Sequence, residues 1–526
     1  MNKKNYTESD SLLSRREFLS TLGATASILA MPQLLHPENP SARAKKSGTS
    51  QGKSKGNIVV IITDSLRFDH VGCYGSRIKT PNLDKLAAEG VKFLHAYSEN
   101  LPTMPTRRGW WTGKYHFHEA GWQPFTSDDY LLAEILWDQG YTSALITDVY
   151  HMHKPVYNCG RGFDTTVFIR GQEYDPWIVD PEIKVDVDKS PIHRLRGGEG
   201  REGDETWRSR FAQYLKNCTV RKTEEDYCVA RVVKEAIRWL EYVTKRQKDK
   251  LFLWVDIADP HEPWDPPPPY NRMYTDPKYT GPDLVDPVPG DVEGYMTPEE
   301  MKHTMGLYAG EVTFVDKWVG ILLERLKELG VYDNSLIMHT ADHGQPLGEH
   351  GYVRKARPRN YEELIHIPWI VRHPEGLSAG KDISAIVQTV DMLPTILEAV
   401  GIRSDKLTLK FTEPDQSSSK SVNIFPQDLV TRQQRQVLSG CNLMPLIEGK
   451  ASHVRDLAFG GHHNREWYAR SKEWTYLLPI DGSRPPELYD RQSDPGEQHN
   501  VINENPEVAM GLELELRRFV NGLQKT

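Results

Sequence analysis

The sequence predicts an α/β protein: a large domain with a central, mostly parallel sheet flanked by helices, then a smaller C-terminal subdomain with an antiparallel sheet and a helix. Three observations predict it. Over residues 57–402, short apolar segments rich in β-branched residues alternate with helix-like segments. Several of the apolar segments end in aspartate or histidine. From about residue 439, short strand-like segments follow one another and a helix-like segment closes the chain.

Length and composition agree with this organisation. A chain of 526 residues exceeds what one hydrophobic core usually organises, so two domains are expected. Hydrophobic residues make up 38% and charged residues 26%, which is typical of a globular protein with a polar surface. The net charge of -8 would repel phosphate backbones. Nucleic acid is therefore not an expected partner, while a local basic pocket for a small anion remains compatible with the composition.

The N-terminus is typical of an export signal. "SRREFLS" (14–20) places Arg15 and Arg16 before a mildly apolar stretch that stops at Pro32, too short to span a bilayer. The segment resembles a twin-arginine signal, and "ARA" (42–44) offers a cleavage site. We predict a signal peptide over 1–44, a polar leader over 45–56, the twin-arginine export machinery as a partner, and a periplasmic or extracellular location. An anchor or an unstructured leader is the alternative interpretation.

The rest of the chain has no segment apolar enough to cross a membrane, so the mature chain is predicted to lack a transmembrane segment. Five cysteines are an odd number for an exported protein, and none forms a CxxC pair. At least one thiol must be unpaired. Cys218 and Cys228 flank a short segment, but their spacing does not decide whether they form a disulfide.

Four segments predict buried parallel strands that deliver polar side chains at their carboxyl ends. In chain order they are "NIVVIITDS" with Asp64, "TSALITD" with Asp148, "KLFLWVDIADPH" with Asp256, Asp259 and His261, and "NSLIMHTADHG" with Asp342 and His343. Helix-like segments over 80–91, 129–140 and 226–246 separate them. Because ligands of open α/β sheets bind at the carboxyl ends of the strands, we expect one shared site there.

Asp64, Asp342 and His343 are the predicted metal ligands. Two carboxylates and an imidazole from different strand ends can hold one divalent cation. The oxygen ligands suit Ca²⁺, Mg²⁺ or Mn²⁺, and the imidazole extends the choice towards Mn²⁺ or Zn²⁺. Asp256, Asp259 and His261 lie too close along one strand end for a full second metal site, and we expect them, with Trp264, to shape the substrate pocket.

Four further side chains are candidates for neutralising charge on a tetrahedral ester: Arg107, His151, His261 and Lys355. A histidine can also protonate a leaving group. Taken singly, an arginine or lysine is more often a solvated surface charge. Spacing alone does not select these four.

After residue 402 the apolar periodicity is lost. Residues 403–438, which include "DQSSSKS", are predicted to be a polar connector or surface insertion. Residues 439–526 then form the C-terminal subdomain. Its strand-like segments are "LAFGG", "EWYARS", "EWTYLLP" and "ELYDR", and its closing helix lies around "PEVAMGLELELRRFVNGL".

Successive blocks of the chain resemble the sulfatases of the alkaline phosphatase superfamily. The blocks are "NIVVIITDSLRFDHVGCYG", "TPNLDKLAAEGVKF", "PTRRGWWTGK", "FLWVDIADPHEPWDPP", "SLIMHTADHGQPLGEHG", "VQTVDMLPTILEAVGI" and "ELYDRQSDPGEQHN". They run in the family's order from about residue 57 to about residue 505. The resemblance implies an alkaline phosphatase-like catalytic domain over 57–402 with a smaller C-terminal subdomain, acting on sulfate or related esters.

The resemblance also implies roles for single residues. Asp64 matches the first metal carboxylate, and Asp342 with His343 matches the Asp-Asn or Asp-His pair late in the domain. Arg107 matches the arginine that closes the nucleophile motif. His261 matches the histidine of "PHxP", and Lys355 the lysine after "GEHG". His151 matches the histidine of the "KWH" block, whose lysine is Asp148 here.

Two positions depart from the family pattern. Ser65 stands where the family has the second of two paired aspartates, which removes one carboxylate from the metal site. The family motif CxPxR reads Thr103, Met104, Pro105, Thr106, Arg107. No cysteine is available there for conversion to formylglycine, so the reaction is expected to proceed without it.

Thr103 is the candidate nucleophile, because a hydroxyl beside a divalent cation can be deprotonated and attack sulfur or phosphorus. The expected activity is hydrolysis of a small anionic ester or a sulfated glycan. A threonine ester must be cleared by activated water, which favours phosphoryl chemistry, whereas the family resemblance favours sulfate. A transferase and a catalytically inactive protein that binds an anionic glycan are the alternatives. Oligomeric state is not predicted.

Overall fold

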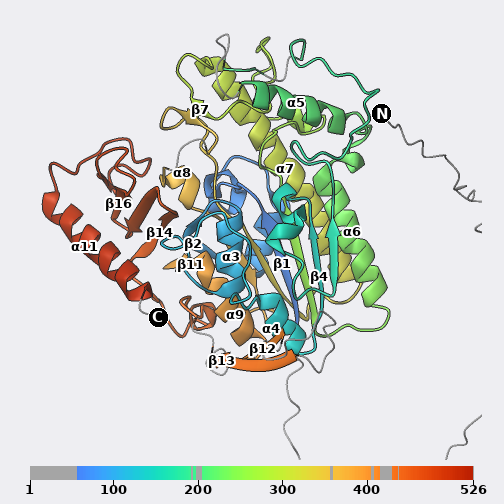
Figure 1. Cartoon of the computed structure of the whole chain (residues 1–526), viewed down its shortest axis with the longest axis vertical. Coiled ribbons are helices and arrows are strands. Elements are labelled where there is room, and N and C mark those ends of the chain that lie inside the picture. Colours follow the sequence, from blue (N-terminus) through green and yellow to red (C-terminus); the bar gives the residue numbers. More distant parts are fainter. Residues whose placement is uncertain are drawn as a thin grey trace, which may run out of the picture. The chain divides into compact units, whose positions relative to one another are not determined.

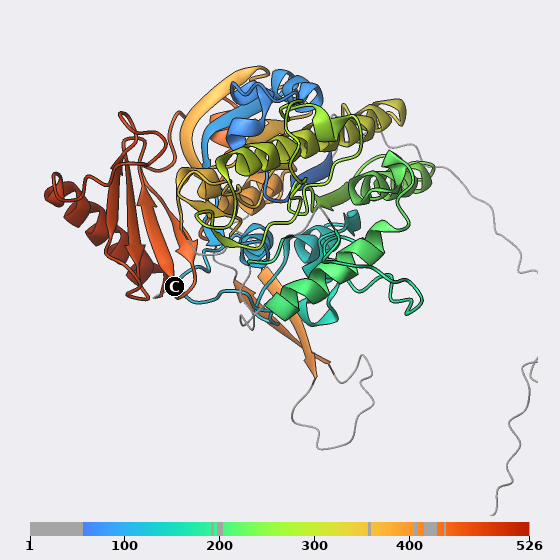
Figure 2. The same ribbon diagram turned by 90° about the horizontal axis from the view of Figure 1, so that it is seen from above.

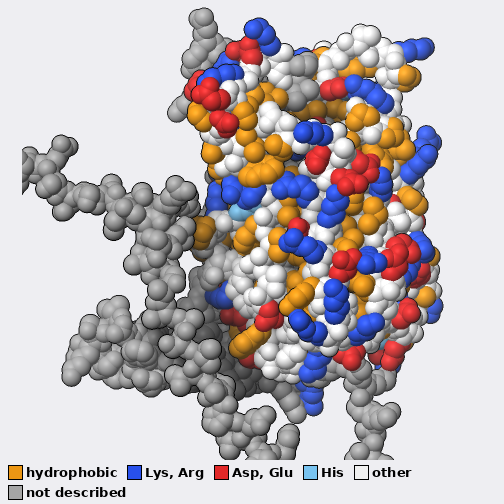
Figure 3. Space-filling model, turned by 90° about the vertical axis from the view of Figure 1, so that its right-hand side faces the viewer, with side chains coloured by type: hydrophobic (Ala, Val, Ile, Leu, Met, Phe, Trp, Pro, Cys, Tyr) orange, Lys and Arg blue, Asp and Glu red, His pale blue; other side chains and the backbone are white. Residues whose placement is uncertain are grey.

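A computed structural model describes residues 56–190, 194–196, 204–355, 359–403, 408–414, 429–435 and 438–524. The signal peptide predicted over 1–44, and the leader over 45–56 except Gly56, lie outside the described residues. Residues 54–526 form one compact unit. Acidic, basic and hydrophobic side chains are interspersed over the face shown in Figure 3.

An eight-stranded sheet organises the large domain, with strand order β11-β2-β10-β8-β1-β6-β4-β5 (Figure 1). Every pairing is parallel except those of β10, which runs antiparallel to both neighbours. The strands are β1 (Asn57–Thr63), β2 (Val91–Tyr97), β4 (Thr142–Thr147), β5 (Thr165–Phe168), β6 (Leu251–Ile257), β8 (Ser335–Thr340), β10 (Trp369–Arg372) and β11 (Lys381–Gln388). The predicted mostly parallel sheet is confirmed.

The four strands expected from the sequence are β1, β4, β6 and β8, and they are consecutive neighbours at the centre of the sheet. All residues of β1, β6 and β8 are buried, because helices cover both faces of a parallel sheet. Their near-continuous apolar character is what made them recognisable. The outer strands β2, β5, β10 and β11 were not anticipated, since they are short or only partly buried.

Helices pack in groups around this sheet (Figures 1 and 2). The 31-residue α7 packs against α2 and α6, while α3 packs against α4 and α9. Thr297 caps the start of α7, where its side chain accepts a hydrogen bond from the Glu300 backbone N–H. The helices are α2 (Pro81–Glu89), α3 (Met104–Thr112), α4 (Leu132–Asp138), α5 (Asp204–Cys218), α6 (Cys228–Val243), α7 (Pro298–Glu328), α8 (Glu362–Ile365), α9 (Met392–Ala399) and α10 (Met444–Ile447).

A second, five-stranded sheet forms the C-terminal part, in the order β17-β16-β15-β14-β3. Its strands β14 (Ala458–His462), β15 (Glu466–Arg470), β16 (Trp474–Pro479) and β17 (Glu487–Asp490) pair antiparallel, and α11 (Pro506–Leu523) packs on β15 and β16. The antiparallel sheet with a closing helix is confirmed. The fifth strand, β3 (Asn100–Leu101), comes from the large domain and pairs parallel with β14. The domain boundaries at 402 and 439 stay predictions.

The connector between the two parts contains structure that its polar composition did not indicate. Within residues 403–438, β12 (Thr408–Pro414) and β13 (Leu429–Arg435) form an antiparallel ladder. All five cysteines lie in the described part of the chain and are free thiols, so Cys218 and Cys228 do not form a disulfide. Among the described helices, none is both long and apolar enough to span a bilayer.

Glu99, just before β3, is a buried carboxyl group with a pH-dependent contribution to stability. It accepts hydrogen bonds from Thr389 Oγ1 and from Asn100 Nδ2. Burial raises its pKa from the usual 4.5 to about 8. The fold therefore favours the protonated form. Its contribution to stability is complete below the unfolded pKa and is lost as pH rises through about 8.

Glu99→Gln should remove this loss. Between pH 5 and pH 9, the free energy of unfolding should fall less for Glu99→Gln than for the wild type, by on the order of 2 kcal/mol, as measured by denaturant titration. Glu515→Gln, at an exposed position of α11, is the matched control and should retain the wild-type dependence. Parallel pH profiles for Glu99→Gln and the wild type would contradict the assignment.

Candidate active site

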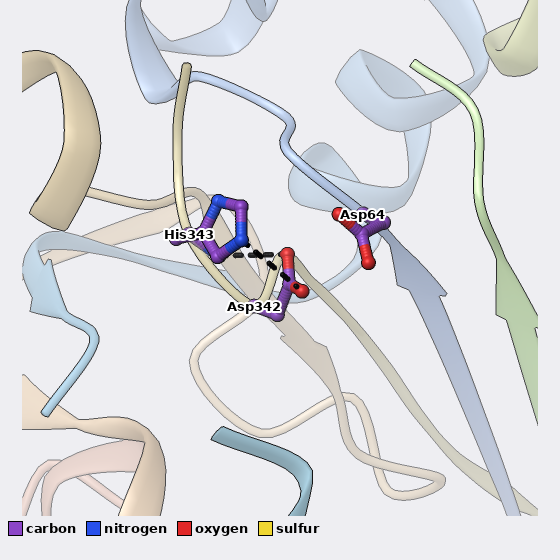
Figure 4. Close-up of side chains that lie close together, drawn as sticks. All are labelled: Asp64, Asp342 and His343. Atoms are coloured by element: carbon purple, nitrogen blue, oxygen red, sulfur yellow. Dashed lines mark hydrogen bonds and ion pairs between the residues drawn. The ribbon is translucent and has the colours of Figure 1, made fainter. Parts of the chain in front are cut away.

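Asp64, Asp342 and His343 meet at the carboxyl ends of two neighbouring central strands. Asp64 follows β1 directly, and Asp342 and His343 follow β8 after one residue, Ala341. All three side chains are buried, and one ligand atom of each lies within 4.8 Å of the others. Figure 4 shows the His343 ring facing Asp342, with Asp64 at the tip of β1. Among the described residues, this is the one cluster of three or more such side chains close enough to share a cation.

The hydrogen bonds of His343 determine which ring nitrogen carries a lone pair. Its Nδ1 lies 2.8 Å from the Gly344 carbonyl oxygen. Because a carbonyl only accepts, Nδ1 must carry the proton, and Nε2 of the neutral ring has the free lone pair. Burial lowers the pKa of His343 to about 4, which keeps the ring neutral near pH 7. Nε2 lies 3.6 Å from Asp342 Oδ2 and 3.4 Å from Thr103 Oγ1.

The charges in this cluster are unbalanced in a way that suits a cation. Burial and the neighbouring Asp342 raise the pKa of Asp64 well above its usual range. Burial also disfavours the charge on Asp342, but His343 and Arg107 outweigh it and hold the pKa of Asp342 below its usual range. Together with Asp256, three carboxyl groups surround the single guanidinium of Arg107. Two oxygen ligands and one imidazole nitrogen fit a divalent ion.

Arg107 joins all three carboxylates. Its Nε donates to Asp256 Oδ2 over 2.9 Å, its Nη1 to Asp342 Oδ2 over 2.9 Å, and its Nη2 to Asp256 Oδ1 and, over 3.2 Å, to Asp64 Oδ2. Nη1 also donates to the Thr103 carbonyl oxygen over 3.1 Å. The side chain is fully buried. Its donors are thus directed at protein groups, so the oxyanion role expected from the sequence is not the one that these contacts indicate.

Thr103 stands at the N-terminus of α3 in a strained conformation. Its φ is +42°, which is unusual for a β-branched residue. Two hydrogen bonds from Arg107, one from its backbone N–H and one from its side chain, hold the Thr103 carbonyl. The side chain is 4% exposed, and its hydroxyl faces the His343 Nε2 lone pair. In this backbone conformation the hydroxyl therefore faces the cluster of candidate metal ligands, Asp64, Asp342 and His343, rather than apolar side chains.

Ser65 lacks a carboxylate, but it forms hydrogen bonds with Asp64, Asp342 and Lys355. Its hydroxyl donates to Asp64 Oδ1 over 2.9 Å, and its backbone N–H donates to Asp342 Oδ1 over 3.0 Å. Lys355 Nζ donates to the Ser65 hydroxyl over 3.0 Å and to Gln345 Oε1 over 3.1 Å, and lies 3.5 Å from Glu262 Oε2. The ammonium group of Lys355 is thereby fixed beside Asp64.

The two other candidate histidines are neutral near pH 7. Burial lowers the pKa of His261 to about 3, and its Nδ1 donates to the Glu262 carbonyl oxygen over 2.8 Å. Burial and then the charges of Lys154 and Arg107 lower the pKa of His151 to about 3. Neither ring therefore carries a positive charge near pH 7, and the roles expected for His151 and His261 at the ester stay predictions.

The sequence did not reveal several partners of these groups. Asp256 was expected to shape the substrate pocket with Trp264, but Asp256 is fully buried against Arg107, and Trp264 is fully buried with its Nε1 donating to the Pro260 carbonyl. Asp259 is likewise buried and accepts from Gln172 Nε2. Glu262 pairs with Arg354, which also pairs with Asp286. The pocket role expected for Asp256 and Trp264 stays a prediction.

His462 reaches the site region from the C-terminal sheet. In the β14–β3 pairing it is opposite Leu101, two residues before Thr103. Its Nδ1 lies 3.0 Å from Asn360 Oδ1, and burial followed by the charge of His343 lowers its pKa to about 3. Sequence reasoning offered no signal for it, because the contact depends on a strand pairing between residues far apart in the chain.

Comparisons with known proteins agree with this architecture. The family profile described as "Sulfatase" matches residues 56–402. The chain is 23% identical to an N-acetylglucosamine-6-O-sulfatase of Bacteroides thetaiotaomicron, with 92% of this chain and 89% of that protein covered. It is 26% identical to an arylsulfatase of Clostridium perfringens, with 85% and 90% covered.

Among solved structures, a phosphonate monoester hydrolase of Agrobacterium radiobacter superimposes with a TM-score of 0.64 at 21% identity, covering 88% of this chain and 96% of that one. The profile match spans about two thirds of the chain and contains every predicted metal ligand. The chain therefore belongs to the sulfatase family, within the alkaline phosphatase superfamily, and is a sulfatase-family ester hydrolase.

Proposed function

We propose that this chain is an exported, metal-dependent ester hydrolase in which Thr103 is the nucleophile in place of formylglycine. The observation that carries the proposal is the position of Thr103 Oγ1, 3.4 Å from His343 Nε2 at the buried cluster of Asp64, Asp342 and His343. No other hydroxyl of the motif can serve, because Thr106 donates its hydroxyl to the Asn100 carbonyl.

Asp64, Asp342 and His343 would hold the divalent cation, whether Ca²⁺, Mn²⁺, Mg²⁺ or Zn²⁺. Bound there, the cation would supply positive charge that favours the ionised form of the nucleophile and withdraws electrons from the ester. Ser65 contributes no carboxylate, so the charge of the ligand set is lower than in a site with two paired aspartates. His343 is already oriented for this task through its Nδ1–H bond to Gly344.

We assign separate roles to the other polar side chains of the site. We assign Arg107 to hold Asp64, Asp342 and the Thr103 carbonyl in place. We assign Lys355 to an ester oxygen, because its side chain is partly exposed at 13%, its hydrogen bonds go to the neutral groups Ser65 and Gln345, and its ion pair with Glu262 is longer, at 3.5 Å. His261 and His151 act as neutral hydrogen-bonding groups around the leaving alcohol, for which their lowered pKa values suit them.

The reaction would proceed in two displacements. Thr103 Oγ1 attacks sulfur or phosphorus, the bond to the alcohol breaks, and the alcohol leaves with a proton. Water then attacks the ester on Thr103, which releases inorganic sulfate or phosphate and restores the hydroxyl. The second step is the harder one for sulfate, because a threonine ester has no aldehyde to reform. A sulfate ester and a phosphate or phosphonate ester are therefore both retained as substrates.

The relatives support an anionic ester on a sugar or aryl group as the substrate. The N-acetylglucosamine-6-O-sulfatase and the arylsulfatase are named for sulfate esters, and the structural neighbour for phosphonate monoesters. A catalytically inactive protein that binds an anionic glycan is the second candidate, favoured by Ser65. Against it, the groups Asp64, Asp342, His343, Arg107 and Lys355 remain connected in one hydrogen-bonded cluster, which His343 joins through its backbone N–H and Lys355 through Ser65. A transferase from Thr103 to another acceptor is the third.

Export through the twin-arginine route to the periplasm or beyond is part of the proposal. It is supported by Arg15 and Arg16 in "SRREFLS" and by the apolar segment that follows. That route transports folded proteins, so the cation could be bound before export.

Replacing the nucleophile should separate catalysis through Thr103 from the inactive binding protein. Thr103→Ala should lower kcat/KM on a responsive sulfate or phosphate ester by on the order of a thousandfold or more, while Thr103→Ser should retain measurable turnover. A quenched wild-type reaction should contain a sulfated or phosphorylated peptide that includes Thr103, as read by mass spectrometry. Unchanged turnover in Thr103→Ala would remove the nucleophile assignment, and a wild type inert towards every ester tested would favour the binding protein.

Cation binding can be tested without any activity. Dialysis against a chelator followed by addition of Ca²⁺, Mn²⁺, Mg²⁺ or Zn²⁺ should raise Tm for at least one ion. The expected gain is about 2.7 kcal/mol at roughly 100-fold excess over Kd. Asp342→Asn should lose the shift. Asp129→Asn is the matched control, since Asp129 is also buried but pairs with Arg108 outside the cluster. A shift of equal size in Asp342→Asn would place the cation elsewhere.

A further inference from the structure

A continuous row of rings begins beside the candidate active site. We name it the aromatic row, and its members are Trp122, His151, Tyr150, Tyr174 and Trp207. The centroids of Trp122 and His151 are 4.9 Å apart, those of His151 and Tyr150 5.1 Å, and those of Tyr150 and Tyr174 5.4 Å. The guanidinium of Arg210 spans the last gap, 4.5 Å from the Tyr174 ring and 4.7 Å from the Trp207 ring.

The row is accessible and adjoins the catalytic cations. Trp122, in the loop between α3 and α4, is 39% exposed, and the other rings are half-buried. Besides burial, the charges of Lys154, Arg107, Arg210 and Lys355 all lower the pKa of His151. His151 is therefore within electrostatic range both of Arg107 and Lys355 and of the cations that stack on the row.

Lys154 and Arg210, the two cationic side chains that stack on rings of the aromatic row, have no carboxylate partner within the described residues. Lys154 Nζ lies 4.7 Å from the Tyr150 ring centroid, and Arg210 lies between Tyr174 and Trp207. Neither forms an ion pair there, unlike Arg170 with Asp175 and Arg354 with Glu262. Stacking holds the two cations without neutralising them. They are thus available for an anion.

Asp286 is within electrostatic range of Arg210 but pairs with Arg354, and Glu173 is a further acidic group near this region. Glu173 acts on Tyr174 together with Arg210, and its carboxyl Oε1 lies 3.9 Å from His261 Nδ1. Burial and the neighbouring Glu262 raise the pKa of Glu173 to about 8. Most of this carboxyl group is therefore protonated and neutral at pH 7.

We propose that the aromatic row, with Lys154 and Arg210, is a subsite for a second sugar unit that carries its own anionic group, next to the unit whose ester is cleaved. An exposed tryptophan offers a flat apolar face to the C–H groups of a pyranose ring. A guanidinium and an ammonium bind a carboxylate or sulfate. An aryl ester would use the rings and leave both cations unmatched. The substrate is accordingly an anionic oligosaccharide rather than an isolated monoester. This inference deepens the proposed function and rests on it for the position of the cleaved ester.

Binding to the full chain tests the subsite independently of turnover. The probe is a defined disaccharide of sulfated glucosamine and uronic acid, compared with its carboxyl-reduced counterpart, titrated calorimetrically into the Thr103→Ala protein. The charged disaccharide should bind about tenfold more tightly than the reduced one. Adding Arg210→Ala or Lys154→Ala should reduce that preference to roughly twofold or less, and should leave binding of the reduced disaccharide nearly unchanged.

Matched controls exclude general effects of charge and folding. Arg246→Ala removes an exposed arginine that stacks on Tyr242 at the far end of α6, and it should retain the full preference. Trp122→Ala should weaken both disaccharides by a similar factor of about five to ten, because it removes stacking rather than charge. Trp137→Ala, at a 59% exposed tryptophan of α4, is its control and should weaken neither. Each variant is compared only after its Tm is shown to match the wild type.

The outcomes distinguish this inference from the proposed function. Equal affinity of the charged and reduced disaccharides would overturn the subsite, even if the wild type hydrolyses simple sulfate esters. An unchanged preference in both Arg210→Ala and Lys154→Ala would overturn it as well. Charge-dependent binding that requires Arg210, in a wild type that hydrolyses no ester, would support the subsite while rejecting the hydrolase.

Discussion

The buried guanidinium of Arg107 is the constraint on which the rest of the site depends. It contacts Asp64, Asp342 and Asp256, which come from three adjacent strands, β1, β8 and β6. Like charges so close together and away from water would repel, and losing one partner of such a cluster typically costs about 3–5 kcal/mol. Arg107 sits one turn into α3, so satisfying the carboxylates also fixes the start of that helix. The hydrogen bonds of Arg107 therefore hold both the candidate metal ligands Asp64 and Asp342 and the backbone of Thr103.

The two departures from the family pattern affect this cluster differently. Ser65 replaces a carboxylate but keeps hydrogen bonds to Asp64, Asp342 and Lys355. Thr103 replaces a cysteine, yet its backbone is held by Arg107 in the conformation that directs its hydroxyl to His343. A site that had merely decayed would be expected to lose such connections. Their persistence supports the proposal that Thr103 takes the place of the cysteine in catalysis.

The C-terminal sheet belongs to the functional architecture as well. Strand β3 lies directly before Thr103 and pairs with β14, which brings His462 opposite Leu101. The pairing of β3 with β14 thus links the C-terminal sheet to the segment that carries Thr103, the proposed nucleophile. On the other side, the rings from Trp122 to Trp207 extend the reaction site into a surface on which a larger substrate can lie. The two sides come from segments that are distant in the sequence.

The central strands could be predicted from sequence because a doubly covered parallel sheet demands continuous apolar segments, and β1, β4, β6 and β8 have them. Because the carboxyl ends of parallel strands lie at one edge of a sheet, the grouping of Asp64 with Asp342 and His343 could be predicted as well. The outer strand β2 escaped detection because "VKFLHAY" is only partly buried. The partners of Asp256, Glu262 and His462 also could not be predicted. The sequence does not indicate whether a carboxylate or imidazole lines a pocket or pairs with another buried side chain.

The sequence by itself determined the central strands, their polar ends and the threonine in the nucleophile motif, because these depend on local composition and spacing. Only the tertiary structure decided what each polar group faces. It directed Arg107 to carboxylates, made His151 and His261 neutral through burial, and left Lys154 and Arg210 without acidic partners among the described residues. The physical reason is that charge, solvation and hydrogen-bond geometry depend on neighbours in space, which residues distant in the chain provide.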